Sequence, residues 1–135
     1  MPVDKTLDSP VDLAKRFIRS GQPLLAVEVL EPWLEEYADD AEAWSVLAGA
    51  RYKLDNLPAA RDAAATAVDV DPRSARYWSN YGMILRKLGQ LYEAERAQHR
   101  ALSVHAGYRR ARTELRKIHE IRSGSRHDLR ESDFI

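Results

Sequence analysis

The sequence predicts an all-α protein built from antiparallel helix pairs. Residues 41–74 and 75–108 align without insertion or deletion, and ten positions are identical at a fixed offset of 34. Apolar residues recur at the three- and four-residue intervals that are typical of helices. A tryptophan near the start of each stretch and small residues later in it are typical of helix-turn-helix repeat arrays. The identical pairs are Ala41/Ala75, Trp44/Trp78, Ser45/Ser79, Lys53/Lys87, Leu54/Leu88, Leu57/Leu91, Ala60/Ala94, Ala63/Ala97, Ala67/Ala101 and Val70/Val104.

Capping and helix-breaking residues set the expected boundaries in the first half of the chain. Ser9 followed by Pro10 predicts a helix start, and Gly21 predicts the end of that helix. A second helix is expected over residues 24–34. The third is expected over 41–54, after an aspartate cap, and the fourth over 57–70, where an Asp-Pro pair ends it.

The same rules give three more helices in the second half. We expect helices over 75–88 and 91–104, with a turn at Gly89 between them. A last helix over about 108–122 has an apolar stripe and a charged face, as a helix that caps a repeat array must have. Residues 123–135 lack periodicity, and we expect a mobile tail there.

The repeat resembles the tetratricopeptide repeat (TPR). The signature positions of that family are matched by Trp44, Leu47, Ala48, Ala60, Ala67 and Pro72, and again by Trp78, Tyr81, Gly82, Ala94 and Ala101. A first repeat holds Leu13, Ala14, Gly21 and Ala26 in the same register, but it has Pro10 in place of the tryptophan and Trp33 in place of a late small residue.

The resemblance implies a right-handed α-solenoid of about seven helices. We therefore expect residues 1–122 to form a single TPR domain. Its three repeats are expected at about 7–40, 41–74 and 75–108, with a capping helix after them. The first repeat departs most from the family pattern, so its packing is the least defined by sequence.

Composition limits the function classes. The chain has no cysteine and no apolar stretch long enough for a membrane span, and we expect a cytoplasmic protein without membrane insertion. The four histidines lack the spacing of a zinc site, and neither a phosphate-binding glycine loop nor a serine-nucleophile elbow is present. The sequence thus predicts no enzyme, no catalytic residue, no metal and no cofactor.

Charge is balanced overall but unevenly distributed. Residues 1–72 carry 14 acidic and 7 basic side chains, whereas residues 73–135 carry 7 acidic and 14 basic ones. Such a distribution is consistent with simple solvation, with attraction of an acidic partner to the basic half, or with head-to-tail pairing of copies. Nucleic acid is not expected as a partner, because the net charge is zero and the tryptophans lie apart from the basic residues.

In TPR proteins the first helix of each repeat lines a concave groove that binds a peptide, so the resemblance implies such a groove here. Helical spacing selects the residues of one stripe on these helices. The candidate groove residues are Lys15, Arg19, Ser45, Gly49, Tyr52, Lys53, Arg76, Ser79, Asn80, Met83, Arg86, Lys87, Arg110, Thr113 and Lys117. This basic and polar stripe predicts an acidic peptide or helical segment as the ligand.

Three roles are compatible with that stripe. The first is an adaptor or scaffold that binds a peptide, with Asn80 holding the peptide backbone. The second is a small export chaperone, and the third is a self-assembling scaffold. Binding of chaperone C-termini is not expected, because Lys15 and Val46 stand where that clamp has asparagines. We also expect that reversing the charges of Arg86 and Lys87 removes binding without changing stability.

Overall fold

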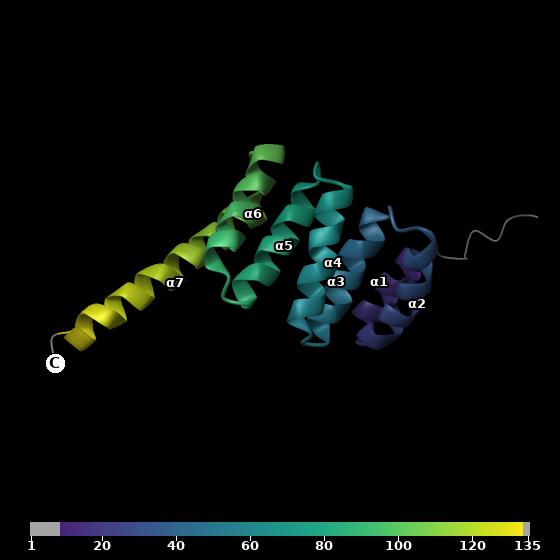
Figure 1. Ribbon diagram of the computed structural model, residues 1–135, viewed down its shortest axis with the longest axis horizontal. Coiled ribbons are helices and arrows are strands. Elements are labelled where there is room, and N and C mark those ends of the chain that lie inside the picture. Colours follow the sequence, from purple (N-terminus) through teal and green to yellow (C-terminus); the bar gives the residue numbers. More distant parts are fainter. Residues whose placement is uncertain (1–8, 134–135) are drawn as a thin grey trace, which may run out of the picture. The chain divides into compact units, whose positions relative to one another are not determined.

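In the computed structural model the chain is a series of helices, shown in Figure 1. The structure describes the backbone of residues 9–133 and the side chains of residues 9–124. Within that part all regular elements are helices. They are α1 (Pro10–Arg19), α2 (Pro23–Glu36), α3 (Ala41–Lys53), α4 (Leu57–Val70), α5 (Ala75–Lys87), α6 (Leu91–Val104) and α7 (Arg109–Asp133).

The predicted repeat period is confirmed by the helix boundaries. Helices α3 and α5 begin and end at equivalent positions of the second and third repeats, and the same holds for α4 and α6. Helix α2 occupies the equivalent positions of the first repeat. Side-chain caps repeat as well, since Asp40 accepts from the amide of Ala43 and Ser74 accepts from the amide of Tyr77. Equivalent sequence positions therefore start and stop equivalent helices.

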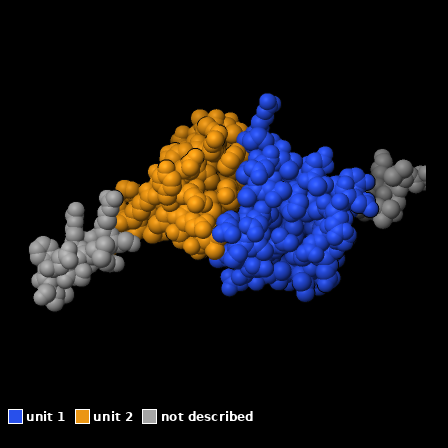
Figure 2. Space-filling view, in the orientation of Figure 1, with its two compact units in different colours: residues 1–73 blue, residues 74–135 orange. Residues whose placement is uncertain are grey.

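The chain divides into two compact units at the end of the second repeat, residues 1–73 and 74–135 (Figure 2). The first unit contains α1 to α4, and consecutive helices contact each other, as do α1 and α3. Its core contains small side chains where helices meet, including Ala14, Ala26, Ala43 and Ala60, all fully buried. Small residues at these positions allow the close approach that short connections require.

The second unit contains α5 to α7. Helix α5 packs on α6, and α7 contacts both of them. Its core includes Leu85, Ala94, Ala97 and Ile118, so residues of all three helices contribute to it. Ile118 lies on α7 and is almost fully buried. Helix α7 thus covers the apolar face of the third repeat, as expected of a capping helix.

Helix α7 is longer than the sequence predicted. We expected the capping helix to end near residue 122, but the helix continues to Asp133. No glycine adopts a left-handed conformation within it, and Gly124 is accommodated in the helix. The expected tail over residues 123–135 lies mostly outside the residues whose side chains are described.

Candidate functional site

The predicted groove residues are divided between the two units. Lys15 and Arg19 lie on α1, and the residues from Ser45 to Lys53 lie on α3, in the first unit. The residues from Arg76 to Lys87 lie on α5, and those from Arg110 to Lys117 lie on α7, in the second unit. In each unit the two helices involved contact each other.

The surface of the first unit is partly neutralised. The Lys15 ammonium forms an ion pair with the Glu42 carboxylate, which links α1 to α3. Arg19 and Lys53 are exposed, while Ser45, Gly49 and Tyr52 are partly buried. Lys15 already has a carboxylate partner, so this surface offers a weaker positive potential than the sequence suggested.

The second surface, which we call the α5–α7 surface, is held together by Arg110. This side chain extends from α7 to α5, where Nη1 donates to Asn80 Oδ1 at 2.7 Å and Nη2 donates to Met83 Sδ at 3.2 Å. Thr113, partly buried, donates to its own helix backbone at Arg109 O. The exposed cations of this surface are Arg76, Lys87, Arg110 and Lys117.

Arg86 is not one of the exposed cations. The expectation that its charge could be reversed without loss of stability is therefore wrong. Its side chain is only 12% exposed, and Nε donates to Glu114 Oε2 at 2.7 Å. Lys117 contacts the other oxygen of the same carboxylate at 3.3 Å. A glutamate at position 86 would place two carboxylates in one buried site, so Arg86 is a structural residue.

Glu114 is buried on α7, and its surroundings favour the ionised form. Burial alone raises the pKa of a carboxyl group, and this is the largest single influence on Glu114. The hydrogen bonds and positive charges of Arg86, followed by those of Lys117, act in the opposite direction and together outweigh burial. The pKa of Glu114 is therefore lowered.

The prediction that Ser79 lines the groove is also wrong. Its side chain is fully buried, and its carbonyl oxygen accepts a hydrogen bond from Gln98 Nε2 at 2.9 Å. The equivalent Ser45 of the second repeat is only partly buried. Position 98 holds glutamine where the second repeat has Ala64, and the longer side chain fills the space beside Ser79. Ser79 cannot contact a ligand.

Sequence reasoning missed the role of Glu114, although a signal was present. Position 114 lies three residues after Ala111 and four before Ile118, both of which are buried. A carboxylate at that spacing belongs to the inward face of the helix. A buried carboxylate needs a charged partner, and such a partner was available on α5.

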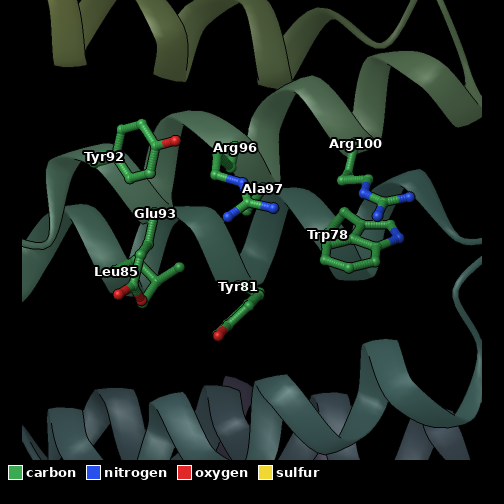
Figure 3. Close-up of a pocket in the computed structure, with 8 residues that line it drawn as sticks. All are labelled: Trp78, Tyr81, Leu85, Tyr92, Glu93, Arg96, Ala97 and Arg100. Carbon is green, nitrogen blue, oxygen red and sulfur yellow. The ribbon is translucent and has the colours of Figure 1, made fainter.

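A second missed feature is a pocket of about 360 Å³ on the second unit, shown in Figure 3. Residues of α5 and α6 line it, with Arg96 and Arg100 extending from α6 across the region between the two helices (Figure 3). We call it the arginine–aromatic pocket. Its lining residues are Trp78, Tyr81, Leu85, Tyr92, Glu93, Arg96, Ala97 and Arg100.

The fold and these surfaces define a helical repeat protein with a basic surface on its last repeat. A family model of the tetratricopeptide repeat matches residues 17–84, which is half of the chain. The chain therefore belongs to the TPR family, and the predicted resemblance is confirmed. None of the curated proteins compared with the chain matched it.

Solved structures show the same fold. MamA is 24% identical, with a TM-score of 0.80 over 84% of this chain and 67% of that one. The second TPR domain of human RPAP3, in complex with an HSP70 peptide, is 24% identical, with a TM-score of 0.77 over 82% of this chain and 92% of the domain. The Yersinia enterocolitica type III secretion chaperone SycD, in complex with a peptide of the translocator YopD, is 20% identical, with a TM-score of 0.77 over 88% and 96% of the two chains.

Among the helices that the structure describes, none combines the length and the apolar character that crossing a membrane would require.

Proposed function

We propose that the chain is a non-enzymatic protein-interaction module, an adaptor or scaffold, whose α5–α7 surface binds an acidic peptide or helical segment. The observation that carries this proposal is the arrangement of four exposed cations on two contacting helices: Arg76, Lys87, Arg110 and Lys117. The carboxylate of Glu114 lies buried beneath them and is already paired with Arg86. Lys117 also contacts this carboxylate, so Arg76, Lys87 and Arg110 are the cations of this surface that have no carboxylate partner among the described residues.

The side chains between these cations suit a peptide. Arg110 fixes the Asn80 carbonyl oxygen, which orients the amide of that side chain on the surface. An oriented amide is suited to a peptide backbone, and the partly buried Met83 offers an adaptable apolar contact beside it. The proposed ligand therefore combines carboxylates with one apolar side chain.

Two structural relatives support this class of function. One is a TPR domain bound to an HSP70 peptide, and the other is a secretion chaperone bound to a peptide of its translocator. Both are peptide complexes of proteins that share this fold.

The proposal is tested by selecting peptides from a random library on the wild-type protein. The expected consensus is rich in aspartate and glutamate with one apolar position. Binding of the selected peptide is then measured by fluorescence anisotropy for a variant with Arg76→Glu and Lys87→Glu. We expect at least a roughly tenfold loss of affinity, as for removal of charge-assisted contacts.

A matched control carries Arg109→Glu and Arg116→Glu, which change the net charge equally. Both arginines are exposed on α7 and lie outside the candidate groove residues. This control should bind nearly as well as wild type. A neutral or basic consensus, or equal losses in both variants, would show that the α5–α7 surface is not the binding site.

A second candidate function is that of a small export chaperone, and the likeness to SycD in complex with a translocator peptide favours it. Such a chaperone binds one cargo and is expected to be poorly soluble without it. Gel filtration of the chain alone and after co-expression with proteins encoded next to it separates the two functions. An adaptor should be monodisperse without cargo, whereas a chaperone should aggregate.

A further inference from the structure

The arginine–aromatic pocket has the chemistry of a protein-binding site, and the proposed peptide site does not use it. The guanidinium of Arg100 lies 5.7 Å from the ring centroid of Trp78, and that of Arg96 lies 6.0 Å from the ring centroid of Tyr92. Stacking on the rings holds both cations in place while they stay exposed. Neither forms an ion pair with a carboxylate among the residues that the structure describes.

Helix packing does not explain these residues, and the second repeat provides the comparison. The positions of the second repeat that are equivalent to Tyr92, Arg96 and Arg100 hold Pro58, Asp62 and Thr66. Helix α4 nevertheless has the same length as α6 and packs on α3 as α6 packs on α5. The third repeat therefore carries two stacked arginines and a tyrosine, 69% exposed, that the fold does not require.

The first unit carries a complementary feature at the turn between α2 and α3. We call residues 35–39, the end of α2 and the start of the connection to α3, the acidic turn; they include the exposed side chains of Glu35, Glu36 and Asp39. Tyr37 lies among them and is 46% exposed. Three exposed carboxylates thus lie within two residues of one exposed aromatic side chain in the sequence.

Several contacts fix the conformation of the acidic turn. The rings of Trp33 and Tyr37 lie 4.2 Å apart between centroids, and Trp33 Nε1 donates to Asp40 Oδ2 at 2.9 Å. Trp44 Nε1 donates to Ala38 O at 2.8 Å. A turn that is already ordered loses little conformational entropy when it binds.

The aromatic residues of the turn are also specific to one repeat. Trp33 corresponds to Ala67 and Ala101, and Tyr37 corresponds to Asp71 and His105. Neither equivalent position is aromatic in the turn after α4, and the turn after α6 has only His105. Both the pocket and the acidic turn contain residues that the other repeats lack. The pocket carries arginines and the turn carries carboxylates, so their charges are complementary.

We propose that the arginine–aromatic pocket binds the acidic turn of a second copy of the chain. Arg96 and Arg100 would pair with the carboxylates of the turn, and the Tyr37 ring would contact the aromatic side chains of the pocket. The residue types involved, tryptophan, tyrosine and arginine, are those enriched at the energetic centres of protein interfaces.

Long-range charge favours the same contact. The first unit carries 14 acidic and 8 basic side chains, and the second carries 7 acidic and 13 basic ones, so their net charges are −6 and +6. The contact joins two different surfaces, so it is heterologous and produces head-to-tail chains or rings of copies.

The test uses two full-length variants that each lose one side of the contact. One carries Arg96→Glu and Arg100→Glu in the pocket, and the other carries Glu35→Gln and Glu36→Gln in the turn. In sedimentation velocity at low salt, wild type should associate as concentration rises. Each variant alone should associate at least about tenfold more weakly. An equal mixture should form a one-to-one complex, because one intact pocket then meets one intact turn.

The mixture also controls for folding, since a complex forms only if each variant retains its intact surface. Arg109→Glu with Arg116→Glu serves as the charge-matched control and should associate like wild type. The proposal is overturned if wild type stays monomeric at all concentrations, if either variant associates like wild type, or if two variants with native circular dichroism spectra fail to form a complex on mixing.

Discussion

At the scale of single residues, the pair formed by Arg86 and Glu114 determines how the α5–α7 surface is organised. The Glu114 side chain is 4% exposed and that of Arg86 is 12% exposed. Each ion would be unstable in this environment without the other, because a buried unpaired charge is costly. The pair fixes α7 on α5, while Arg76, Lys87 and Arg110 face solvent or a ligand.

We predict that Glu114→Gln lowers the free energy of unfolding by roughly 1 to 3 kcal/mol, because glutamine can still accept a hydrogen bond from Arg86 but leaves its buried charge without a counter-ion. Lys117 is half-exposed and contributes little to this loss. Urea denaturation at neutral pH measures the effect. Glu120→Gln, an exposed change on the same helix, is the control and should be nearly neutral. Equal midpoints for the two variants would contradict a structural role for the pair.

The same pair makes stability depend on pH. The pKa of Glu114 is lower in the folded protein than in the unfolded chain, so ionised Glu114 stabilises the fold. This contribution is complete above about pH 4.3, the ordinary glutamate value, and is lost as pH falls through the folded-state pKa. We predict that wild type and Glu114→Gln differ at neutral pH and converge in acid. A stability difference between wild type and Glu114→Gln that grows as the pH falls would contradict this prediction.

Gly82 and Gln98 form a second pair in which one residue makes room for the other. A Cβ atom at position 82 would lie 2.5 Å from Gln98 Nε2 and 3.1 Å from Ala94 O. The second repeat has alanine at both equivalent positions, Ala48 and Ala64. Where the second repeat has two alanines, the third repeat has a glycine without a side chain and a glutamine with a long one.

We predict that Gly82→Ala destabilises the protein by roughly 1 to 3 kcal/mol through overpacking. Adding Gln98→Ala should recover part of that loss, because it removes the nearest atom and restores the alanine pair of the second repeat. Thermal unfolding of both single variants and the double variant gives the coupling energy. Strict additivity of the two changes would show that the side chains do not compete for space.

Sequence could not predict these pairs, although it predicted the helices that carry them. Repeat periodicity gives Ser45 and Ser79 the same role, but the side chain at position 98 decides that Ser79 is buried. Likewise, Arg86 and Glu114 are 28 residues apart and pair only because α7 packs on α5. A linear pattern defines the face of a helix, but not which charge on that face meets a partner.

At the scale of helices, the turns between the two helices of each repeat show how far a periodic pattern can predict structure. Residues 21, 55 and 89, at equivalent positions of the three repeats, all have positive φ, at 78° for Gly21, 60° for Asp55 and 80° for Gly89. The first helix of each repeat ends with the same pair of backbone hydrogen bonds. After α3 these are Asp55 N to Tyr52 O and Asn56 N to Arg51 O. This arrangement is the Schellman motif, which favours glycine at the left-handed position.

Asp55 is the exception among the three turns, and it gives a prediction. A side chain costs energy in the left-handed region, although aspartate tolerates it better than most residues. We predict that Asp55→Gly stabilises the protein by a few tenths to about 1 kcal/mol. Gly89→Asp, the reciprocal change in the next repeat, should destabilise it. Chemical denaturation midpoints that shift in the same direction for both variants would contradict this reasoning.

The capping helix shows where the pattern stops being informative. Helix α7 begins at Arg109, the position equivalent to the start of α5 at Ala75, as the repeat predicts. No glycine or aspartate with positive φ follows at the next equivalent turn position, where the sequence has Ser123. Without a residue that favours positive φ to end it, the helix continues past this position. The prediction of a tail relied only on the lack of apolar periodicity after residue 122.

At the scale of the whole molecule, charge separation connects the two proposed binding surfaces. The basic second unit carries both the α5–α7 surface and the arginine–aromatic pocket, while the acidic turn belongs to the first unit. An acidic partner and a second copy would both be attracted to the second unit. The two surfaces involve different residues, so variants can remove either interaction separately.

Salt should weaken this attraction mainly by slowing association. Several exposed cations on one surface raise the local potential and speed the encounter with an acidic ligand. The screening length falls from about 30 Å at 0.01 M salt to about 8 Å at 0.15 M. We predict that the association rate constant of a selected acidic peptide falls steeply over this range, while its dissociation rate changes less.

Stopped-flow fluorescence measures both rates. Arg76→Glu with Lys87→Glu should flatten the salt dependence of association, because it removes two exposed cations from the α5–α7 surface. Arg96→Glu with Arg100→Glu changes the total charge equally but leaves that surface intact, so peptide dissociation should stay as in wild type. If the pocket variant instead releases the peptide faster than the α5–α7 variant, the peptide binds in the arginine–aromatic pocket and the two proposed sites must be exchanged.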